Sequence, residues 1–227
     1  MRRESLALAI IALAGPFSRT YSYNVPDMPT DLLFIRHGEA RYGSNDGLTS
    51  LGARQAVALA RRLDERGIDH LYSSPLPRAR DTAEAVAQTT GRKPHFDARL
   101  REIDVGEFSR LPDREIKRRS EDYFRPDVLP VLDFSDRKGE GPTELHVRAA
   151  AVLGDLFLDG APDLGRVAVV SHGGFINAAL CILLGMEFSG PLRFRLANTS
   201  ITTARIVGGG AVLLAVNDIT HLHSLTD

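Results

Sequence analysis

The chain has 227 residues, of which 43% are apolar and 25% are charged, and its formal net charge is -1. A chain of this length and composition forms one large domain, or one domain with an insertion, and is neither fibrous nor disordered. The near-zero charge argues against general nucleic-acid binding. The single cysteine, Cys181, excludes an intramolecular disulfide and a cysteine metal cluster.

The first 29 residues are predicted to be an extension of a main domain that spans residues 30–227. Two arginines precede an apolar run at 6–14, an arrangement typical of a secretory signal. The run is too short to cross a bilayer, which takes about 20 apolar residues. We expect a cytoplasmic protein, or an exported one if residues 1–14 are a signal peptide. A short helix docked on the domain, or a start site placed too early, also fits this segment.

The main domain begins with alternating strand and helix patterns. Residues 32–35 form a continuous apolar run, as expected of a strand that is buried on both faces. A helix follows, with Ser50 as its expected cap and Gly67 as its stop. A second strand is predicted at 68–72, and the helix after it ends near Gly91. The helical spacing rests on Ala56, Leu59, Ala60 and Leu63 in the first helix, and on Ala79, Thr82, Ala83 and Val86 in the second.

Residues 109–139 are charged and interrupted by proline, which predicts a small cap insertion with one short helix and no part in the core. Beyond it the pattern alternates again. The later elements expected are an amphipathic helix at 145–156, an apolar strand at 167–170, an apolar helix ending near 184, and two strands at 201–207 and 211–216 joined by glycines. The whole pattern predicts an α/β fold, a three-layer α/β/α sandwich with a mostly parallel sheet.

Two of the predicted strands end in a histidine followed by glycine. The first apolar strand runs into Arg36-His37-Gly38, and the strand at 167–170 runs into His172-Gly173. Ligands bind at the carboxyl ends of the strands in open α/β sheets, so we expect both histidines in one site. The second strand leads to Arg78 at the same edge, and helix N-termini nearby add N–H donors. These residues predict an anion site.

The order of these segments resembles the histidine phosphatase superfamily, also called the phosphoglycerate mutase-like family. The resemblance extends from residue 32 to near the C-terminus. The matching segments are 32–39, 48–52, 73–83, 100–106, 170–174 and 198–201. It implies the phosphoglycerate mutase-like form of the α/β/α sandwich, and an enzyme that uses no metal and no cofactor.

The resemblance also implies roles for particular residues. His37 would be the nucleophile that forms a phosphohistidine, and Arg36 and Arg78 would hold the phosphoryl oxygens. His172 would complete the pocket as a further donor, and Glu102 would be the general acid. Gly173 and Asn45 are further candidates for phosphate binding. Arg80 competes with Arg78 for its role, and Asp104 and Glu107 compete with Glu102.

Three functions are open on this sequence. The first is a metal-independent phosphomonoesterase acting on a small phosphorylated metabolite. The alternatives are phosphoglycerate mutase-type phosphotransfer and a catalytically silent phosphate-binding module. Ala40 and Gly43 stand where many family members, the mutases above all, carry a hydroxyl residue and an asparagine, which favours hydrolysis.

The expected partner is a small-molecule phosphate ester, with no nucleic acid and no membrane. The sequence leaves the oligomeric state open, a homodimer included. The other histidines show no ligand pattern and are expected at the surface: His70, His95, His146, His221 and His223. Cys181 lies on an apolar helix and is expected in the core.

Overall fold

The computed structural model describes residues 29–41, 47–112, 114–116, 118–119, 129–155, 165–207 and 210–225. The extension at 1–28, the candidate Asn45, the end of the helix expected at 145–156, and two of the glycines before residue 210 lie outside the described residues. No described helix is long and apolar enough to cross a membrane.

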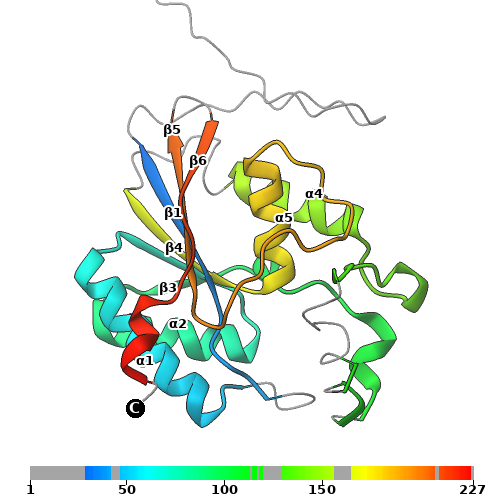
Figure 1. Ribbon diagram of the computed structural model, residues 1–227, viewed down its shortest axis with the longest axis horizontal. Coiled ribbons are helices and arrows are strands. Elements are labelled where there is room, and N and C mark those ends of the chain that lie inside the picture. Colours follow the sequence, from blue (N-terminus) through cyan, green and yellow to red (C-terminus); the bar gives the residue numbers. More distant parts are fainter. Residues whose placement is uncertain are drawn as a thin grey trace, which may run out of the picture.

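The centre of the molecule is one six-stranded sheet with the order β3-β2-β4-β1-β5-β6 (Figure 1). The pairings β1–β4, β2–β4 and β2–β3 are parallel, and the two pairings that involve β5 are antiparallel. The sheet is therefore mostly parallel, as predicted. The strands are β1 (Thr30–Arg36), β2 (His70–Ser73), β3 (Pro94–Phe96), β4 (Arg166–Ser171), β5 (Ile201–Val207) and β6 (Gly210–Asp218).

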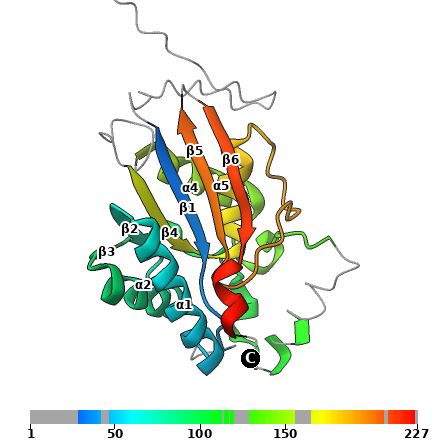
Figure 2. The same cartoon turned by 60° about the vertical axis from the view of Figure 1, so that its left-hand side comes forward.

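Helices cover both faces of this sheet, which confirms the three-layer architecture (Figures 1 and 2). On one face lie α1 (Ser50–Arg66) and α2 (Pro77–Thr90), and on the other α4 (Pro142–Leu153) and α5 (Gly173–Leu183). Short 3₁₀ helices complete the fold: η1 (Ala98–Leu100), η2 (Gly106–Arg110), η3 (Ser135–Arg137) and η5 (Thr220–Leu225).

The apolar run of β1 explains why both faces are covered. Leu33 and Ile35 pack in one core cluster with the buried side chains of α1 and α2. Leu32 and Phe34 point to the opposite face and pack with α4 and α5. Since successive side chains of a strand alternate between faces, a strand that is apolar at every position needs a layer on each side.

The helix ends follow the expected glycines, with one shift at the start of α1. Gly67 and Gly91 end α1 and α2 at φ 69° and 68°, a range that favours glycine. The cap of α1 is Thr49, not Ser50: its side chain accepts the Gly52 N–H, and its backbone is extended. Ser50 is already the first helical residue, so the prediction was wrong by one position.

Two features of the fold differ from the sequence analysis. The edge strand β3 was not predicted, because three residues that are exposed or half-buried carry no apolar pattern. Leu132 belongs to the core next to α5, although the insertion at 109–139 was expected to stay outside it. Its N–H donates to the Gly190 carbonyl at 2.8 Å, which holds this part of the insertion against the domain.

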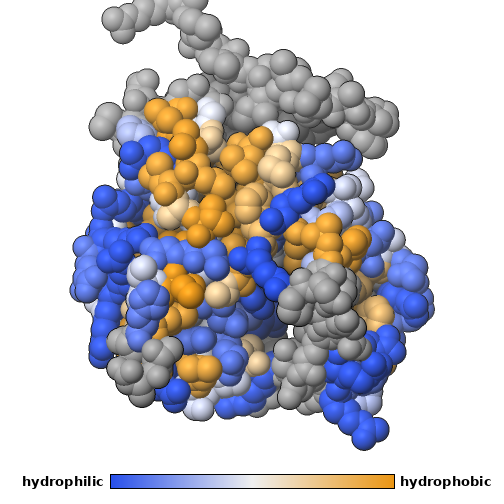
Figure 3. Space-filling view, in the orientation of Figure 1, coloured by the Kyte–Doolittle hydropathy of each residue, from blue (hydrophilic) through white to orange (hydrophobic). Residues whose placement is uncertain are grey.

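At the antiparallel edge of the sheet, part of one face is not covered by any of the described helices. Figure 3 shows a hydrophobic area over β5 and β6. Exposed apolar side chains on these strands are Val207, Val212, Leu214 and Val216.

Candidate active site

The carboxyl ends of β1 and β4 bring the two candidate histidines together. The strands are parallel neighbours, with Arg36 opposite Ser171 in the register. His37 follows the first strand, and His172 follows the second as the N-cap of α5. Their ring centroids are 5.0 Å apart, and both residues are buried. The two rings are therefore neighbours at the carboxyl edge of the sheet, where the sequence analysis expected both.

The contacts of His37 define which ring nitrogen carries its proton. Nδ1 lies 2.7 Å from the Gly38 carbonyl oxygen, which can only accept, so Nδ1 donates. Nε2 lies 3.2 Å from Nε of Arg78, which can only donate, so Nε2 accepts. Burial, then the charges of Arg78 and Arg36, hold the pKa of His37 well below 6.5. The ring is therefore neutral at pH 7, with its lone pair on Nε2.

The backbone around His37 is held from several elements. The Gly38 N–H donates to Thr82 Oγ1 on α2 at 3.0 Å, and Asn198 Nδ2 donates to the His37 carbonyl at 3.0 Å. A Cβ on Gly38 would stand 2.8 Å from the Gly52 carbonyl oxygen, so α1 packs too closely for any other residue. These contacts fix the imidazole before any ligand arrives.

Both candidate arginines lie beside the two rings. Arg78 is the second residue of α2, and its Nε contacts His37 as described. Arg36 is anchored by donation from Nη1 to the Leu196 carbonyl at 2.6 Å. A Cβ on Gly173 would stand 3.9 Å from Arg36 Nε, so Gly173 is also at this edge. Arg80 is exposed and donates instead to the Pro75 carbonyl.

His172 is held by a serine that the sequence analysis did not assign. Its Nε2 lies 2.8 Å from Ser74 Oγ, which in turn accepts the Leu76 N–H at 3.2 Å. Nδ1 of His172 is buried and has no hydrogen-bond partner among the described residues. Burial, then the charges of His37, Arg78 and Arg36, hold the pKa of His172 well below 6.5. This ring is also neutral at pH 7.

The Glu102 carboxylate sits on the first turn of α5, directly after His172. Its Oε2 accepts the Gly174 N–H at 3.2 Å, and its Oε1 accepts the Phe175 N–H at 3.3 Å. Oε1 also accepts the Ile103 N–H at 3.0 Å. A Cβ on Gly174 would collide with Oε1, so only glycine leaves room for this carboxylate. The glycine at position 174 is the feature of the sequence from which this close contact could have been predicted.

The other two carboxylates considered for the acid do not reach α5. Asp104 is exposed, and its Oδ1 accepts the Gly106 N–H at 2.8 Å. Glu107 forms an ion pair with Lys138 at 2.7 Å and is exposed. The structure thus brings together Arg36, His37, Arg78, Glu102, His172 and Gly173, while Asn45 lies outside the described residues.

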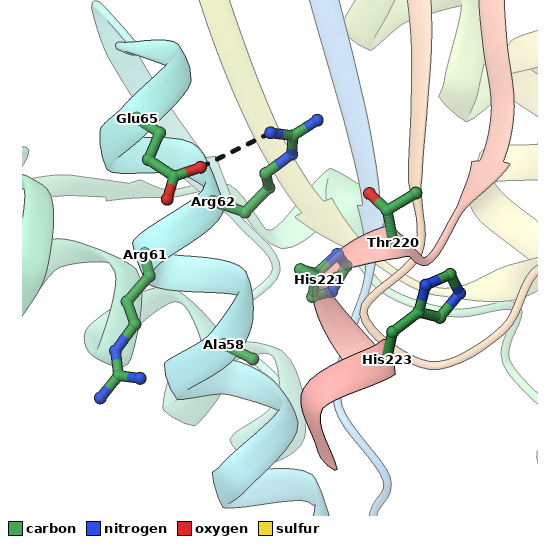
Figure 4. Close-up of a pocket in the computed structure, with 7 residues that line it drawn as sticks. All are labelled: Ala58, Arg61, Arg62, Glu65, Thr220, His221 and His223. Carbon is green, nitrogen blue, oxygen red and sulfur yellow. Dashed lines mark ion pairs between the residues drawn. The ribbon is translucent and has the colours of Figure 1, made fainter. Parts of the chain in front are cut away.

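Three of the remaining histidines are not simple surface residues. His70, His146 and His221 are half-buried, whereas His95 and His223 are exposed as expected. His221 lines a cavity of about 540 Å³ between α1 and η5, and Figure 4 shows its ring turned toward α1. Its Nε2 lies 3.2 Å from Thr199 Oγ1. No group of three or more metal-ligand side chains occurs among the described residues.

The chain is similar to known phosphatases and mutases over most of its length. It is 32% identical over 201 residues to a probable phosphoglycerate mutase, GpmB, of Escherichia coli, covering 83% of this chain and 93% of the relative. A phosphoserine phosphatase structure from Entamoeba histolytica is 28% identical with a TM-score of 0.64, covering 85% of this chain and 99% of the other. A mycobacterial glucosyl-3-phosphoglycerate phosphatase is 26% identical with a TM-score of 0.63, covering 84% and 98%.

Residues 32–219 match the family model of the histidine phosphatase superfamily, branch 1. This range includes both histidines, both arginines and Glu102. The chain belongs to the histidine phosphatase superfamily.

Proposed function

We propose that the protein is a metal-independent phosphomonoesterase that hydrolyses a small phosphorylated metabolite through a phosphohistidine at Nε2 of His37. The observation that carries this proposal is the neutral His37 ring, with Nδ1 bonded to the Gly38 carbonyl and Nε2 free of a proton. A neutral imidazole with a fixed tautomer is a nucleophile that needs no separate base. Arg36 and Arg78 supply the positive charge that a metal ion supplies in other phosphatases.

In the first step Nε2 of His37 attacks phosphorus and forms the N–P bond as the bond to the leaving oxygen breaks. Arg78 Nε, which donates to Nε2 in this structure, turns to a phosphoryl oxygen when the ester binds. Arg36 and the backbone of Gly173 bind the remaining oxygens, and charge on these oxygens is stabilised by positioned donors. The bond from His37 Nδ1 to the Gly38 carbonyl stabilises the positive charge that develops on the ring.

His172 contributes a neutral donor to the same group. The hydroxyl of Ser74 has one hydrogen to give, and we assign it to Nε2 of His172 at 2.8 Å, the acceptor that this hydroxyl meets among the described residues. With Nε2 accepting, the hydrogen of the neutral ring is on Nδ1, the atom without a partner among the described residues. We assign this N–H to a phosphoryl oxygen of the bound ester.

Glu102 is the proposed general acid. It gives a proton to the leaving alkoxide in the first step and takes one from the attacking water in the second. Water then breaks the N–P bond, inorganic phosphate leaves, and His37 is regenerated. Oε2 accepts one N–H while Oε1 accepts two, so we assign the transferred proton to Oε2. The contact with α5, which Asp104 and Glu107 do not make, supports this choice.

Mutase-type phosphotransfer is the second candidate, favoured by the similarity to the probable phosphoglycerate mutase. The similarity to the two solved phosphatases favours hydrolysis. The two reactions share His37 and differ in the acceptor of the phosphoryl group: water in one, a second hydroxyl in the other. A catalytically silent module would do neither.

The test is phosphate release from a panel of phosphorylated metabolites, with 3-phosphoglycerate and phosphoserine included, with and without EDTA. Hydrolysis predicts release of inorganic phosphate at a rate that EDTA does not change. Conversion of 3- to 2-phosphoglycerate without release would establish the mutase instead. Loss of activity in EDTA that Mg²⁺ or Zn²⁺ restores would contradict the metal-independent mechanism.

A further inference from the structure

A partly buried ion pair that the sequence analysis did not identify lies against the backbone of Glu102. Arg148, on α4, bonds with its guanidinium to both oxygens of Glu140, at 2.8 Å from Nε and 2.6 Å from Nη2. The side chains are only 16% and 14% exposed. We infer that Arg148, oriented by Glu140, is a positioning residue that holds Glu102 in line with the leaving group. This inference rests on the proposed acid role of Glu102.

The other hydrogens of the guanidinium all go to the chain that carries Glu102. Nη1 donates to the carbonyls of Arg99 at 2.6 Å and Arg101 at 2.8 Å. Nη2 is 3.4 Å from the carbonyl of Glu102 itself. One planar group thus binds three backbone oxygens within four consecutive residues, which a flexible surface arginine does not do.

Glu140 extends the same attachment to the far side of Glu102. Its Oε2 accepts the Asp104 N–H at 3.2 Å, and its own N–H donates to the Asp104 carbonyl at 2.8 Å. The backbone on both sides of Glu102 is therefore fastened to the same ion pair. This stretch contains no strand or α-helix, and besides these bonds it is held by the burial of Leu100 and Ile103 in the core.

Glu102 is consequently held at two points from two helices. Its backbone is fixed from α4 through Arg148, and its carboxylate is fixed on the first turn of α5. The two supports also meet, since the Arg148 guanidinium carbon lies 5.8 Å from the centre of the Phe175 ring. Because His172 caps the same helix, this arrangement ties the acid to the phosphoryl pocket.

Lysine cannot replace arginine in this arrangement. A single ammonium group is a point charge that can contact Glu140 or the carbonyls, but not all four groups in one plane. Arg148→Lys keeps the charge opposite Glu140 and so avoids a partly buried carboxylate without a partner, the costly consequence of removing one member of the pair. It removes only the planar set of hydrogen bonds that the guanidinium makes, so any loss of activity reports on the positioning of Glu102 and not on a lost charge.

The experiment compares Arg148→Lys on two substrates, an alkyl phosphate and nitrophenyl phosphate. Nitrophenolate leaves without a proton, so only the alkyl ester needs a well-placed acid. We expect kcat for the alkyl ester to fall by about 10²-fold, the scale of a misplacement of about 1 Å. The rate for nitrophenyl phosphate, and the phosphoenzyme formed from it, should stay close to wild type. Glu140→Gln should give a smaller loss with the same selectivity.

A matched control is Arg205→Lys. Arg205 also forms a two-point pair with a carboxylate, bonding to Asp31 at 2.7 and 2.9 Å, but it lies on β5 outside the site. This variant should change the two ester rates equally or leave both unchanged. Thermal melts of all variants test whether they are folded. If Arg148→Lys does not fold, the two ester rates are compared in Glu140→Gln instead.

Combination with Glu102→Gln shows whether Arg148 acts through the acid. If it does, the variant with both changes loses no more activity on the alkyl ester than Glu102→Gln alone. Fully additive losses, or equal losses of Arg148→Lys on both esters, or none on either, would overturn the inference while leaving the acid role intact. Absence of alkyl selectivity in Glu102→Gln itself would refute the acid role, and the inference with it.

Discussion

Arg78 donates from Nε to Nε2 of His37 at 3.2 Å, which places a permanent cation on the one ring nitrogen that is free to attack. The contact lowers the pKa of the imidazole by charge, in addition to the larger effect of burial. In the proposed mechanism the guanidinium exchanges this nitrogen for an anionic oxygen of the bound ester. Arg78 would then both keep the nucleophile neutral and attract the substrate.

Replacing His37 by alanine should abolish turnover and prevent phosphoenzyme trapping, because no other group presents a lone pair to the bound phosphorus. The fold should persist, since the strands and helices around His37 pack through other side chains. Acid-quenched trapping from labelled substrate and a thermal melt measure the two expectations. More than trace activity in the folded variant would rule out covalent catalysis at this residue.

Replacing Glu102 by glutamine should slow alkyl ester hydrolysis by roughly 10²–10⁴-fold, the usual contribution of a general acid. Nitrophenyl phosphate should be affected much less, because its leaving group departs unprotonated. The amide keeps the size of the side chain, so the two rates compare proton donation rather than packing. Equal losses on both esters would indicate a binding or structural role, and no loss would shift the assignment to Asp104 or Glu107.

Replacing Gly174 by alanine should displace the Glu102 carboxylate, because the new Cβ would occupy the space of Oε1. Gly173→Ala is the comparison for stability, since its Cβ meets no atom nearer than Arg36 Nε at 3.9 Å. We expect the first variant to have the lower melting temperature and an activity loss concentrated on alkyl esters. Equal melting temperatures would mean that the helix start tolerates the added atom.

The two buried histidines predict how stability depends on pH. Both have a folded-state pKa well below the unfolded value of about 6.5. The unfolded chain therefore binds protons at these sites that the folded chain does not, as the pH falls below 6.5. Their contribution to stability is complete above pH 6.5 and is lost progressively toward the folded-state pKa.

Urea unfolding at pH 7.5, 6.5 and 5.5 measures this dependence, with His37→Gln as the variant that removes one of the two groups. The variant should lose less stability than wild type between pH 6.5 and 5.5. Aryl ester turnover by wild type should show no acidic limb near pH 6.5, because His37 remains unprotonated there. A limb at that pH would show that the ring titrates as an exposed histidine does.

Much of the fold is encoded locally and was predicted from the sequence. The run at 32–35 is apolar at every position, which requires a covering layer on each face, and the helix stops at Gly67 and Gly91 are single-residue signals. The site histidines were predicted for a similar reason. A buried parallel strand has its carboxyl end at a known edge of the sheet, so His37 and His172 had to lie at the same edge.

Contacts between distant segments could not be derived in this way. Ser74 reaches His172 across 98 positions of the chain, and Arg148 reaches the Glu102 carbonyl across 46. Neither residue differs in its local pattern from many other serines and arginines of the sequence. Leu132 likewise joined the core, although the insertion that carries it is charged and interrupted by proline as a whole.

The sequence by itself determined the layers of the fold and the strand ends at which His37 and His172 lie. These follow from periodicity, glycine positions and motif order, which are properties of short segments. Tertiary structure alone decided the tautomer of His37, the contact between Ser74 and His172, and the attachment of the Glu102 segment to two helices. Hydrogen bonds and burial depend on which atoms lie within about 3 Å of one another. Only the folded chain defines those distances.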